Sequence, residues 1–219
     1  MDKKQYVVIG LGRFGTSVAE TLYNLGNDVL VIDIDEESVQ NISNNVTHAI
    51  QADATDEVAL REVGVRNFDV AIVSVGSDIQ ASIMATILLK ELGIKQVVAK
   101  ATNAMHAKVL KKIGANKVVF PEKDMGVRVA HGLVFSNILE YIELSPDYSI
   151  AEFISPVEWN GKSLQELNIR GEFGINVVAI RRESEVDVTP FPTEIINKDD
   201  VIVAIGNVED LKKLENRIQ

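Results

Sequence analysis

The 219-residue sequence predicts an α/β protein: a doubly wound, parallel-sheet domain, then a crossover helix and a small α+β domain. Three features predict this. Short apolar runs alternate with amphipathic helical stretches over residues 5–120, glycine repeatedly ends the helical stretches, and the rhythm changes after residue 124. Consecutive β-branched residues indicate strands buried on both faces, as in a parallel sheet covered by helices. Glycine ends a helix because it readily takes the left-handed conformation of a C-terminal cap.

The first part of the chain contains six strand-like runs. They cover residues 5–10, 29–32, 48–51, 70–75, 96–100 and 117–120. The helical stretches between them cover residues 13–25, 36–42, 57–63, 79–92 and 105–113. Regular alternation of strands and helices gives a doubly wound sheet, so we expect a Rossmann-type domain.

The second part begins with apolar residues at helical spacing, which predict one long crossover helix over 124–144. Strand patterns then follow at 150–154, 176–180, 186–189 and 201–205, with short helices at 163–167 and 208–216. We therefore place the first domain with its crossover helix at 1–143 and the small domain at 144–219. A domain of roughly seventy residues is near the lower limit for independent folding, so dimerisation would help to stabilise it.

Composition excludes several classes of function. The net charge of −10 argues against binding nucleic acid or an anionic membrane surface, because both need clustered Lys and Arg. The absence of cysteine excludes disulfides, thiolate nucleophiles and cysteine metal sites. No apolar stretch of about 18 residues is present, so we expect no membrane-spanning helix. The first residues lack the pattern of a signal peptide.

A glycine-rich motif, Gly10-Leu11-Gly12-Arg13-Phe14-Gly15, follows the first predicted strand and opens the first helix. Alone this motif is weak evidence, but here an acidic residue, Asp33, stands about twenty residues further on at the end of the second strand. Gly10 allows a tight turn, Gly12 lets a phosphate approach the backbone, and Gly15 lets the helix pack close to the strand. The helix N-terminus then holds the anion.

Two charged residues refine this interpretation. Asp33 is expected to accept hydrogen bonds from ribose hydroxyls, and its charge disfavours the 2′-phosphate of NADP. The guanidinium of Arg13 is expected to pair with phosphate oxygens, including a terminal phosphate beyond the pyrophosphate. The alternatives are a glycine turn kept for packing, with Asp33 as a helix cap, and a solvated arginine on the first helical turn.

Further candidates stand at the carboxyl ends of strands, where open α/β sheets bind ligands. Asp53, Ala54 and Thr55 follow the third strand and are candidates to border an adenine. The alternative is that Asp53 or Thr55 caps the next helix. Lys100 ends the fifth strand and either meets phosphate or extends along the surface. Glu122 follows the sixth strand; it is a candidate ligand for ribose or, with phosphates, for Mg²⁺ or Ca²⁺. Spacing alone favours the alternative of an acid at a helix N-terminus.

Binding fits the sequence better than catalysis. The three histidines are His48, His106 and His131, and none falls in the small domain. A nicotinamide dehydrogenase needs a substrate domain with a proton donor, and no Ser–His–Asp order, metal-ligand spacing or Walker loop is present. We therefore expect a ligand sensor and no enzyme. The alternatives are a small NAD-dependent oxidoreductase and an NADH redox sensor.

The sequence resembles the cytosolic regulatory subunits of Ktr-type bacterial potassium transporters, in the RCK (regulator of potassium conductance) or TrkA-like family. The resemblance covers essentially the whole chain. It rests on the motifs VIGLGRFG at 8–15, DID at 33–35, IQAS at 79–82, KELG at 90–93, KIGA at 112–115 and PEKDMG at 121–126.

This resemblance implies an RCK N-domain, a crossover helix and an RCK C-domain. It implies a homodimer that assembles into an octameric ring in the cytoplasm, on the inner face of the membrane, beneath a membrane-embedded potassium-translocating subunit. It also implies that ATP and ADP compete for the Rossmann site and favour different ring shapes, with NAD or NADH as further ligands.

The family's roles carry over onto matching residues. The three motif glycines are implied to hold phosphate, Arg13 to reach the terminal phosphate and Asp33 to hold ribose. Glu122 is implied to lie near the phosphates and a divalent cation of a neighbouring protomer.

The resemblance also implies that cyclic di-AMP binds between two C-domains and inactivates transport. Arg170 and Asn176 are the polar candidates for its phosphates and bases. The apolar candidates are Leu164, Ile169, Val177 and Pro192, although residue chemistry alone places Ile169 and Val177 in the core.

Overall fold

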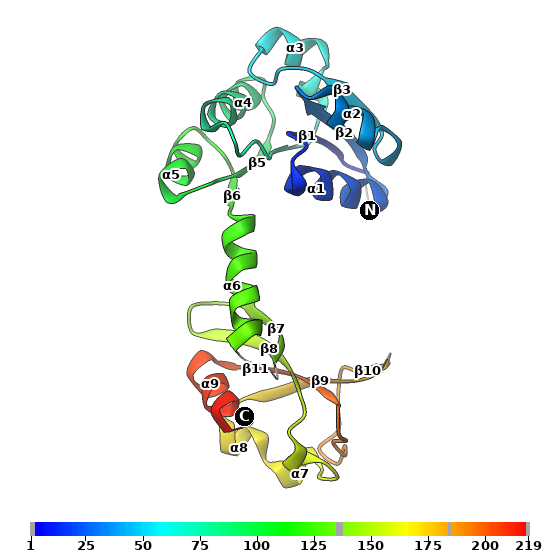
Figure 1. Ribbon diagram of the computed structural model, residues 1–219, viewed down its shortest axis with the longest axis vertical. Coiled ribbons are helices and arrows are strands. Elements are labelled where there is room, and N and C mark those ends of the chain that lie inside the picture. The colour runs from blue at the N-terminus through cyan, green and yellow to red at the C-terminus, as the bar shows by residue number, and fades with distance from the viewer. Residues whose placement is uncertain (1–2, 135–137, 184, 218–219) are drawn as a thin grey trace. The chain divides into compact units, whose positions relative to one another are not determined.

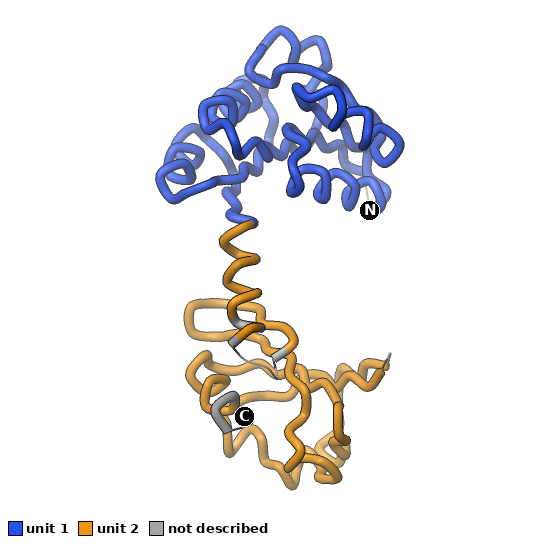
Figure 2. The backbone as a smooth tube through the Cα atoms, in the orientation of Figure 1, with its two compact units in different colours: residues 1–121 blue, residues 122–219 orange. Residues whose placement is uncertain are grey.

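A computed structural model describes residues 3–134, 138–183 and 185–217. The chain divides into two compact units, residues 1–121 and 122–219, coloured separately in Figure 2. Each unit has its own sheet and its own buried apolar core.

The first unit is built on a six-stranded parallel sheet with the order β3-β2-β1-β4-β5-β6 (Figure 1). Its strands are β1 Gln5–Ile9, β2 Asp28–Asp33, β3 His48–Gln51, β4 Val70–Val73, β5 Gln96–Lys100 and β6 Lys117–Val119. The predicted Rossmann-type sheet is therefore confirmed. The strand order reverses between β1 and β4, and ligands bind beyond the carboxyl ends of strands at such a switch point.

Helices cover both faces of this sheet. They are α1 Arg13–Asn24, α2 Glu36–Ile42, α3 Glu57–Glu62, α4 Ile79–Glu91 and α5 Ala104–Lys112. Successive residues of β1 enter different clusters: Val7 and Ile9 pack with Leu89 of α4, whereas Val8 packs with Ala19 of α1. Burial on both faces explains why these strands are runs of consecutive apolar residues.

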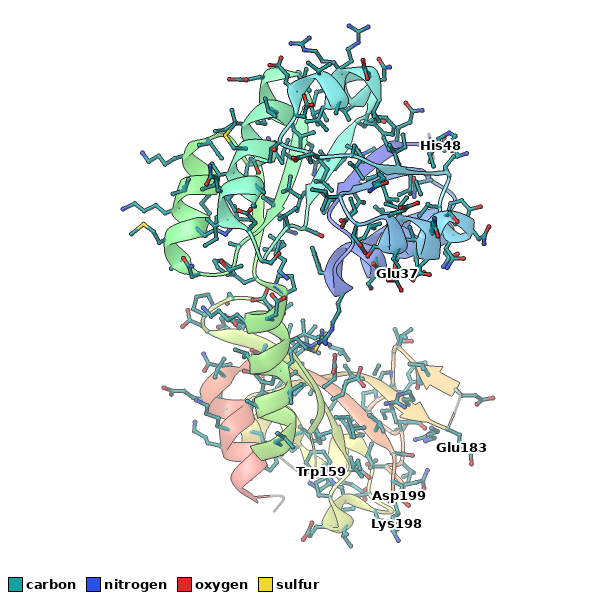
Figure 3. The ribbon with its side chains drawn as sticks, turned by 45° about the horizontal axis from the view of Figure 1, so that its top comes forward. Glu37, His48, Trp159, Glu183, Lys198 and Asp199 are labelled. Carbon is teal, nitrogen blue, oxygen red and sulfur yellow. The ribbon has the colours of Figure 1, made fainter. Side chains whose placement is uncertain are left out.

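The second unit combines α6 Pro121–Val134, whose first residue is the last of the first unit, with a five-stranded antiparallel sheet of order β10-β9-β11-β8-β7. Its strands are β7 Ile138–Glu143, β8 Tyr148–Ile154, β9 Asn176–Arg182, β10 Glu185–Asp187 and β11 Val201–Asn207. Its shorter helices are α7 Leu164–Leu167, α8 Ile169–Phe173 and α9 Val208–Arg217. Trp159, labelled in Figure 3, belongs to the core of this unit. Its ring meets that of Phe153 edge-on, with the ring centroids 6.0 Å apart.

The long helix expected over 124–144 is wrong in its last third. The helix ends at Val134, and β7 follows as an edge strand paired with β8. A short run of apolar residues fits a helix and a strand equally well, so the long-range pairing with β8 decides its conformation. The two compact units divide at 121/122, so both α6 and β7 group with the second unit, β7 through its pairing with β8. The domain division expected at 143/144 stays a prediction.

No helix in the described part of the chain is long and apolar enough to cross a membrane.

Candidate functional site

The N-terminus of α1 differs from those of the other helices of the first unit. Helices α2, α3, α4 and α5 each begin with a side chain that accepts a hydrogen bond from a main-chain N–H of the first turn, namely Asp35, Asp56, Asp78 and Asn103. Helix α1 begins after Gly12, which has no side chain to do so, and its first turn contains no acidic residue. The first N–H groups of α1 therefore have no acceptor from the helix or from a cap, and the positive end of the dipole favours an anion there.

The glycine loop between β1 and α1 is held by close packing. Gly10 has φ +91°, a conformation that disfavours any side chain, and its carbonyl oxygen accepts a 2.5 Å hydrogen bond from the hydroxyl of Ser74. A methyl group on Gly15 would overlap both the Gly10 carbonyl oxygen and the Ser74 hydroxyl. These contacts fix the direction in which α1 leaves the sheet. Ser74 was not expected from the sequence, although it directly follows β4 at the switch point.

The outer side of the loop is open. A methyl group on Gly12 would meet nothing within 4 Å, and Gly12 has an ordinary φ of −66°. Arg13, beside it, is exposed on the first turn of α1. Phe14 is half-buried and packs against the core cluster that contains Val8 and Leu11, so its side chain attaches the loop to the core. The geometry leaves room for a phosphate over Gly12, within reach of a cationic side chain.

Asp33, at the end of β2, is tied to the glycine loop. Its Oδ2 accepts a 2.5 Å hydrogen bond from the main-chain N–H of Leu11, and its Oδ1 accepts one of 2.9 Å from the N–H of Asp35. Asp35, not Asp33, caps α2. The carboxylate thus lies at the carboxyl edge of the sheet beside the loop, where a ribose joined to a phosphate over Gly12 would meet it.

The residues after β3 form a hydrogen-bonded turn. The carboxylate of Asp53 accepts bonds from the main-chain N–H of Thr55 at 2.8 Å and from its hydroxyl at 2.7 Å, and these bonds lower the pKa of Asp53. Asp56 caps α3, so neither Asp53 nor Thr55 is the helix cap. Ala54 is partly buried against the larger core cluster. The turn is at the same sheet edge as Asp33, next to β2.

The two remaining residues expected at this site, Lys100 and Glu122, lie in different units of the chain. The Nζ atom of Lys100, at the end of β5, is 3.3 Å from the place that a Cβ on Gly76 would occupy, so the lysine reaches the loop that follows β4. Lys100 and the glycine loop therefore flank the same switch point. Glu122 is in the first turn of α6, in the second unit.

A pocket of about 290 Å³ opens on the second unit. It is lined by all six residues expected there, namely Leu164, Ile169, Arg170, Asn176, Val177 and Pro192. The structure adds Gln165, Asn168, Ile175 and Pro190, which no pattern in the sequence distinguishes from their neighbours. Ile169 also belongs to the core, and Val177 packs against it, so these two side chains both line the pocket and contribute to the core.

Acid–base and metal chemistry have little support among the described residues. His48 is exposed on the edge strand of the first sheet (Figure 3), whereas His106 is buried, and burial lowers its pKa. No group of three or more metal-ligating side chains occurs within residues 3–134, 138–183 and 185–217. The described groups suit binding of an anionic ligand.

The features above define a Rossmann-type nucleotide-binding domain joined to a small α+β domain with a pocket. Comparison with known families matches residues 6–121 to the TrkA-N domain and residues 151–219 to the TrkA-C domain. The chain therefore belongs to the TrkA family of potassium transport proteins.

Relatives agree with this assignment over the whole chain. The sequence is 46% identical to Ktr system potassium uptake protein C and 45% identical to Ktr system potassium uptake protein A of Bacillus subtilis (strain 168). Each alignment spans 216 residues and 99% of this chain, with 98% and 97% of the respective relative. The fold is similar to that of a GsuK channel bound to NAD, with a TM-score of 0.67 and 16% identity over 99% of this chain and 40% of the channel chain.

The glycine loop yields a matched pair of substitutions. Gly15→Ala should lower the free energy of unfolding of the first unit by about 1–3 kcal/mol, because the methyl group is forced onto the Gly10 carbonyl and Ser74. Gly12→Ala should leave that free energy within about 0.5 kcal/mol of the wild type, because its methyl group meets nothing. Urea unfolding followed by circular dichroism measures both.

For nucleotide affinity, in contrast to stability, we expect a large effect of the substitution at Gly12. If a nucleotide phosphate binds over Gly12, Gly12→Ala should weaken ATP and ADP binding roughly tenfold or more, because the methyl group would take the place of the phosphate. A tenfold loss corresponds to about 1.4 kcal/mol. Isothermal titration calorimetry measures this affinity. If the folded Gly12→Ala chain binds ATP and ADP as tightly as the wild type, the phosphate does not bind over Gly12.

Proposed function

We propose that this chain is the cytoplasmic regulatory subunit of a bacterial potassium uptake system, controlled by ATP and ADP in its first unit and by cyclic di-AMP in its second. The uncapped N-terminus of α1, open over Gly12 and flanked by Arg13, carries the nucleotide part. Identity of 46% to Ktr system potassium uptake protein C supports the transport part. The chain acts by binding, without catalytic turnover.

In the proposed nucleotide complex, phosphates bind the N–H groups at the start of α1, and Asp33 accepts hydrogen bonds from the ribose. Arg13 reaches the terminal phosphate, which only ATP possesses, and Lys100 adds positive charge from the β4–β5 side. The turn around Asp53 and Thr55 borders the base. NAD or NADH, which carry the same pyrophosphate and ribose groups, are further ligands of this site.

A divalent cation, Mg²⁺ or Ca²⁺, would neutralise phosphate charge at this site. Carboxylate and phosphate oxygens are the ligands that these cations prefer, and Glu122 is the proposed carboxylate ligand, contributed toward the nucleotide of a neighbouring copy. The described residues hold no complete ligand set of their own, so phosphates and a second copy would complete it.

The pocket of the second unit has the chemistry for a cyclic dinucleotide. Arg170 offers a guanidinium to a phosphate, and Asn176 offers an amide to a base edge. Apolar side chains, among them Leu164 and Pro192, provide a surface against which a base can pack. A second copy of the unit would cover the open side of the pocket.

Exposed apolar side chains support a homodimer through the second unit. Met125, Val127, Val129 and Leu133 of α6 are between 46% and 81% exposed. Leu139 and Ile142 of β7 are 47% and 45% exposed. Such apolar surface is typical of a protein–protein interface. We propose that dimers assemble into an octameric ring that contacts a membrane-embedded potassium-translocating subunit.

The proposed control is a shift between ring shapes. A ligand moves such an equilibrium only by its difference in affinity for the two shapes. ATP and ADP differ by one phosphate, so Arg13 and a cation are where that difference arises. Cyclic di-AMP acts in the other unit and favours the inactive shape.

Complementation tests the transport role. In a Bacillus subtilis strain lacking its Ktr system potassium uptake proteins A and C, this chain should restore growth at limiting potassium, and Gly12→Ala should not. The Gly15→Ala chain, which is expected to be less stable, shows how loss of stability alone affects growth, so that this effect can be told apart from loss of nucleotide binding in Gly12→Ala. A stably produced wild-type chain that restores no potassium uptake would contradict the proposed role.

Arg13→Ala tests the discrimination between ATP and ADP. The substitution should weaken ATP binding roughly tenfold more than ADP binding, because a charge-assisted hydrogen bond contributes about 1.5–3 kcal/mol. Arg61→Ala is the matched control, since Arg61 is an exposed arginine paired with Glu57 on α3. Affinity is measured by titration calorimetry. Equal losses of affinity for both nucleotides would contradict the proposed contact between Arg13 and the terminal phosphate.

A further inference from the structure

Arg182, the last residue of β9, is bonded to three residues of the segment 192–200, namely Glu194, Ile195 and Asp200. Its Nε donates to the two carboxylate oxygens of Asp200 at 3.1 and 3.2 Å, and its Nη1 donates to Glu194 at 2.7 Å. Its Nη2 donates to the main-chain oxygen of Ile195 at 2.8 Å. Asp200 is 4% exposed and also accepts a bond from the N–H of Asn197. Arg182 thus ties the middle and the C-terminal end of this segment to β9.

The same segment is bonded on its other side to the chain that enters α7. The N–H of Gln165 donates to the oxygen of Pro192 at 2.8 Å, and the N–H of Leu164 donates to the oxygen of Glu194 at 3.0 Å. Two more main-chain bonds continue this pairing, from Gly161 to Ile196 and from Ile196 to Lys162. The segment is therefore fixed between Arg182 and α7.

These bonds connect the walls of the pocket. The pocket is lined by Leu164 and Gln165 of α7, by Pro190 and Pro192, and by residues of α8 and the start of β9. We call the first four residues one wall and the residues of α8 and β9 the other. Arg182 ends the strand whose start forms the second wall, and it grips the segment that carries Pro192. We propose that Arg182 is a positioning residue that holds the two walls of this pocket at the separation needed for a cyclic dinucleotide. This inference rests on the proposed binding of cyclic di-AMP.

The arrangement requires a guanidinium. Its planar fork bonds at once to two carboxylates and a carbonyl, which a single ammonium group cannot do in this geometry. Arg181, the preceding residue, makes one 3.4 Å contact with Glu152 and none of these bonds. The two arginines have the same charge and the same strand but different partners, so Arg181 provides a matched control.

The first test compares Arg182→Gln with Arg181→Gln in the full chain. Arg182→Gln should weaken cyclic di-AMP binding about tenfold or more in titration calorimetry, and Arg181→Gln should change it by less than about twofold. Affinity for ATP should be unchanged in both chains. Trp159, the sole tryptophan of the chain, is buried in the second core, so its fluorescence reports whether this unit is folded.

A second variant covers the case in which Arg182→Gln unfolds the unit, since it leaves Asp200 buried without its cation. Glu194→Gln keeps the shape of a partner that is 29% exposed and should weaken cyclic di-AMP binding in the same direction by a smaller factor. If either variant retains native Trp159 fluorescence and wild-type affinity for cyclic di-AMP, the positioning role is wrong.

Amide hydrogen exchange tests the positioning role without ligand. The N–H groups of Leu164 and Gln165 should exchange faster in Arg182→Gln than in Arg181→Gln, because their acceptors lie on the segment that Arg182 holds. Failure of the wild-type chain to bind cyclic di-AMP would contradict the proposed function of the pocket. In that case faster exchange supports the positioning role of Arg182, and unchanged exchange overturns it.

Discussion

The proposed nucleotide site depends on how closely the first turn of α1 packs against the end of β1. Gly15 lies against the Gly10 carbonyl and the Ser74 hydroxyl with no room for a methyl group, and this contact joins the loops that follow β1 and β4. The contact sets the direction of α1, and with it the direction of the N–H groups left uncapped at Gly12. Asp33 then holds the outer part of the loop through Leu11. The proposed anion site at this point rests on packing, because close contacts within the protein set both the helix direction and the loop shape.

The proposed ligand sites of the two units are built differently. In the proposed site of the first unit, the main chain would provide the donors, and the surrounding side chains would add charge and ribose contacts at the carboxyl edge of a sheet buried on both faces. In the second, a small antiparallel sheet leaves part of its core, including Ile169 and Ile175, lining an open pocket. A core that reaches the surface needs support from the loops around it, and the bonds from Arg182 and α7 to the segment 192–200 provide that support. Each unit has its own core, so a ligand can stabilise one unit and leave the other unit's stability unchanged.

The sequence was most informative where local pattern and global fold agree. The parallel strands, their buried runs and the roles of Gly10 and Gly15 could be predicted, because period, glycine position and the acidic residue after β2 all indicate one fold. The pocket residues were placed by resemblance, since Ile169 and Val177 read locally as core. The prediction from the sequence was wrong at β7. The spacing of Leu139 and Ile142 fits a helix, and only pairing with β8 makes this segment a strand. The hydrogen bonds of Ser74 and Arg182 join residues far apart in the chain, so no local pattern identifies them.

Thermal unfolding of the wild-type chain with ATP, ADP, NADH and cyclic di-AMP, followed by circular dichroism and by Trp159 fluorescence, tests the two-site account most directly. A ligand at about a hundred times its Kd stabilises its unit by roughly 2.7 kcal/mol, a shift of a few degrees. ATP and ADP should raise the transition of the first unit, and cyclic di-AMP should raise the transition that Trp159 reports. A shift with NADH alone, and none with ATP, ADP or cyclic di-AMP, would contradict the account and favour a redox sensor or an oxidoreductase.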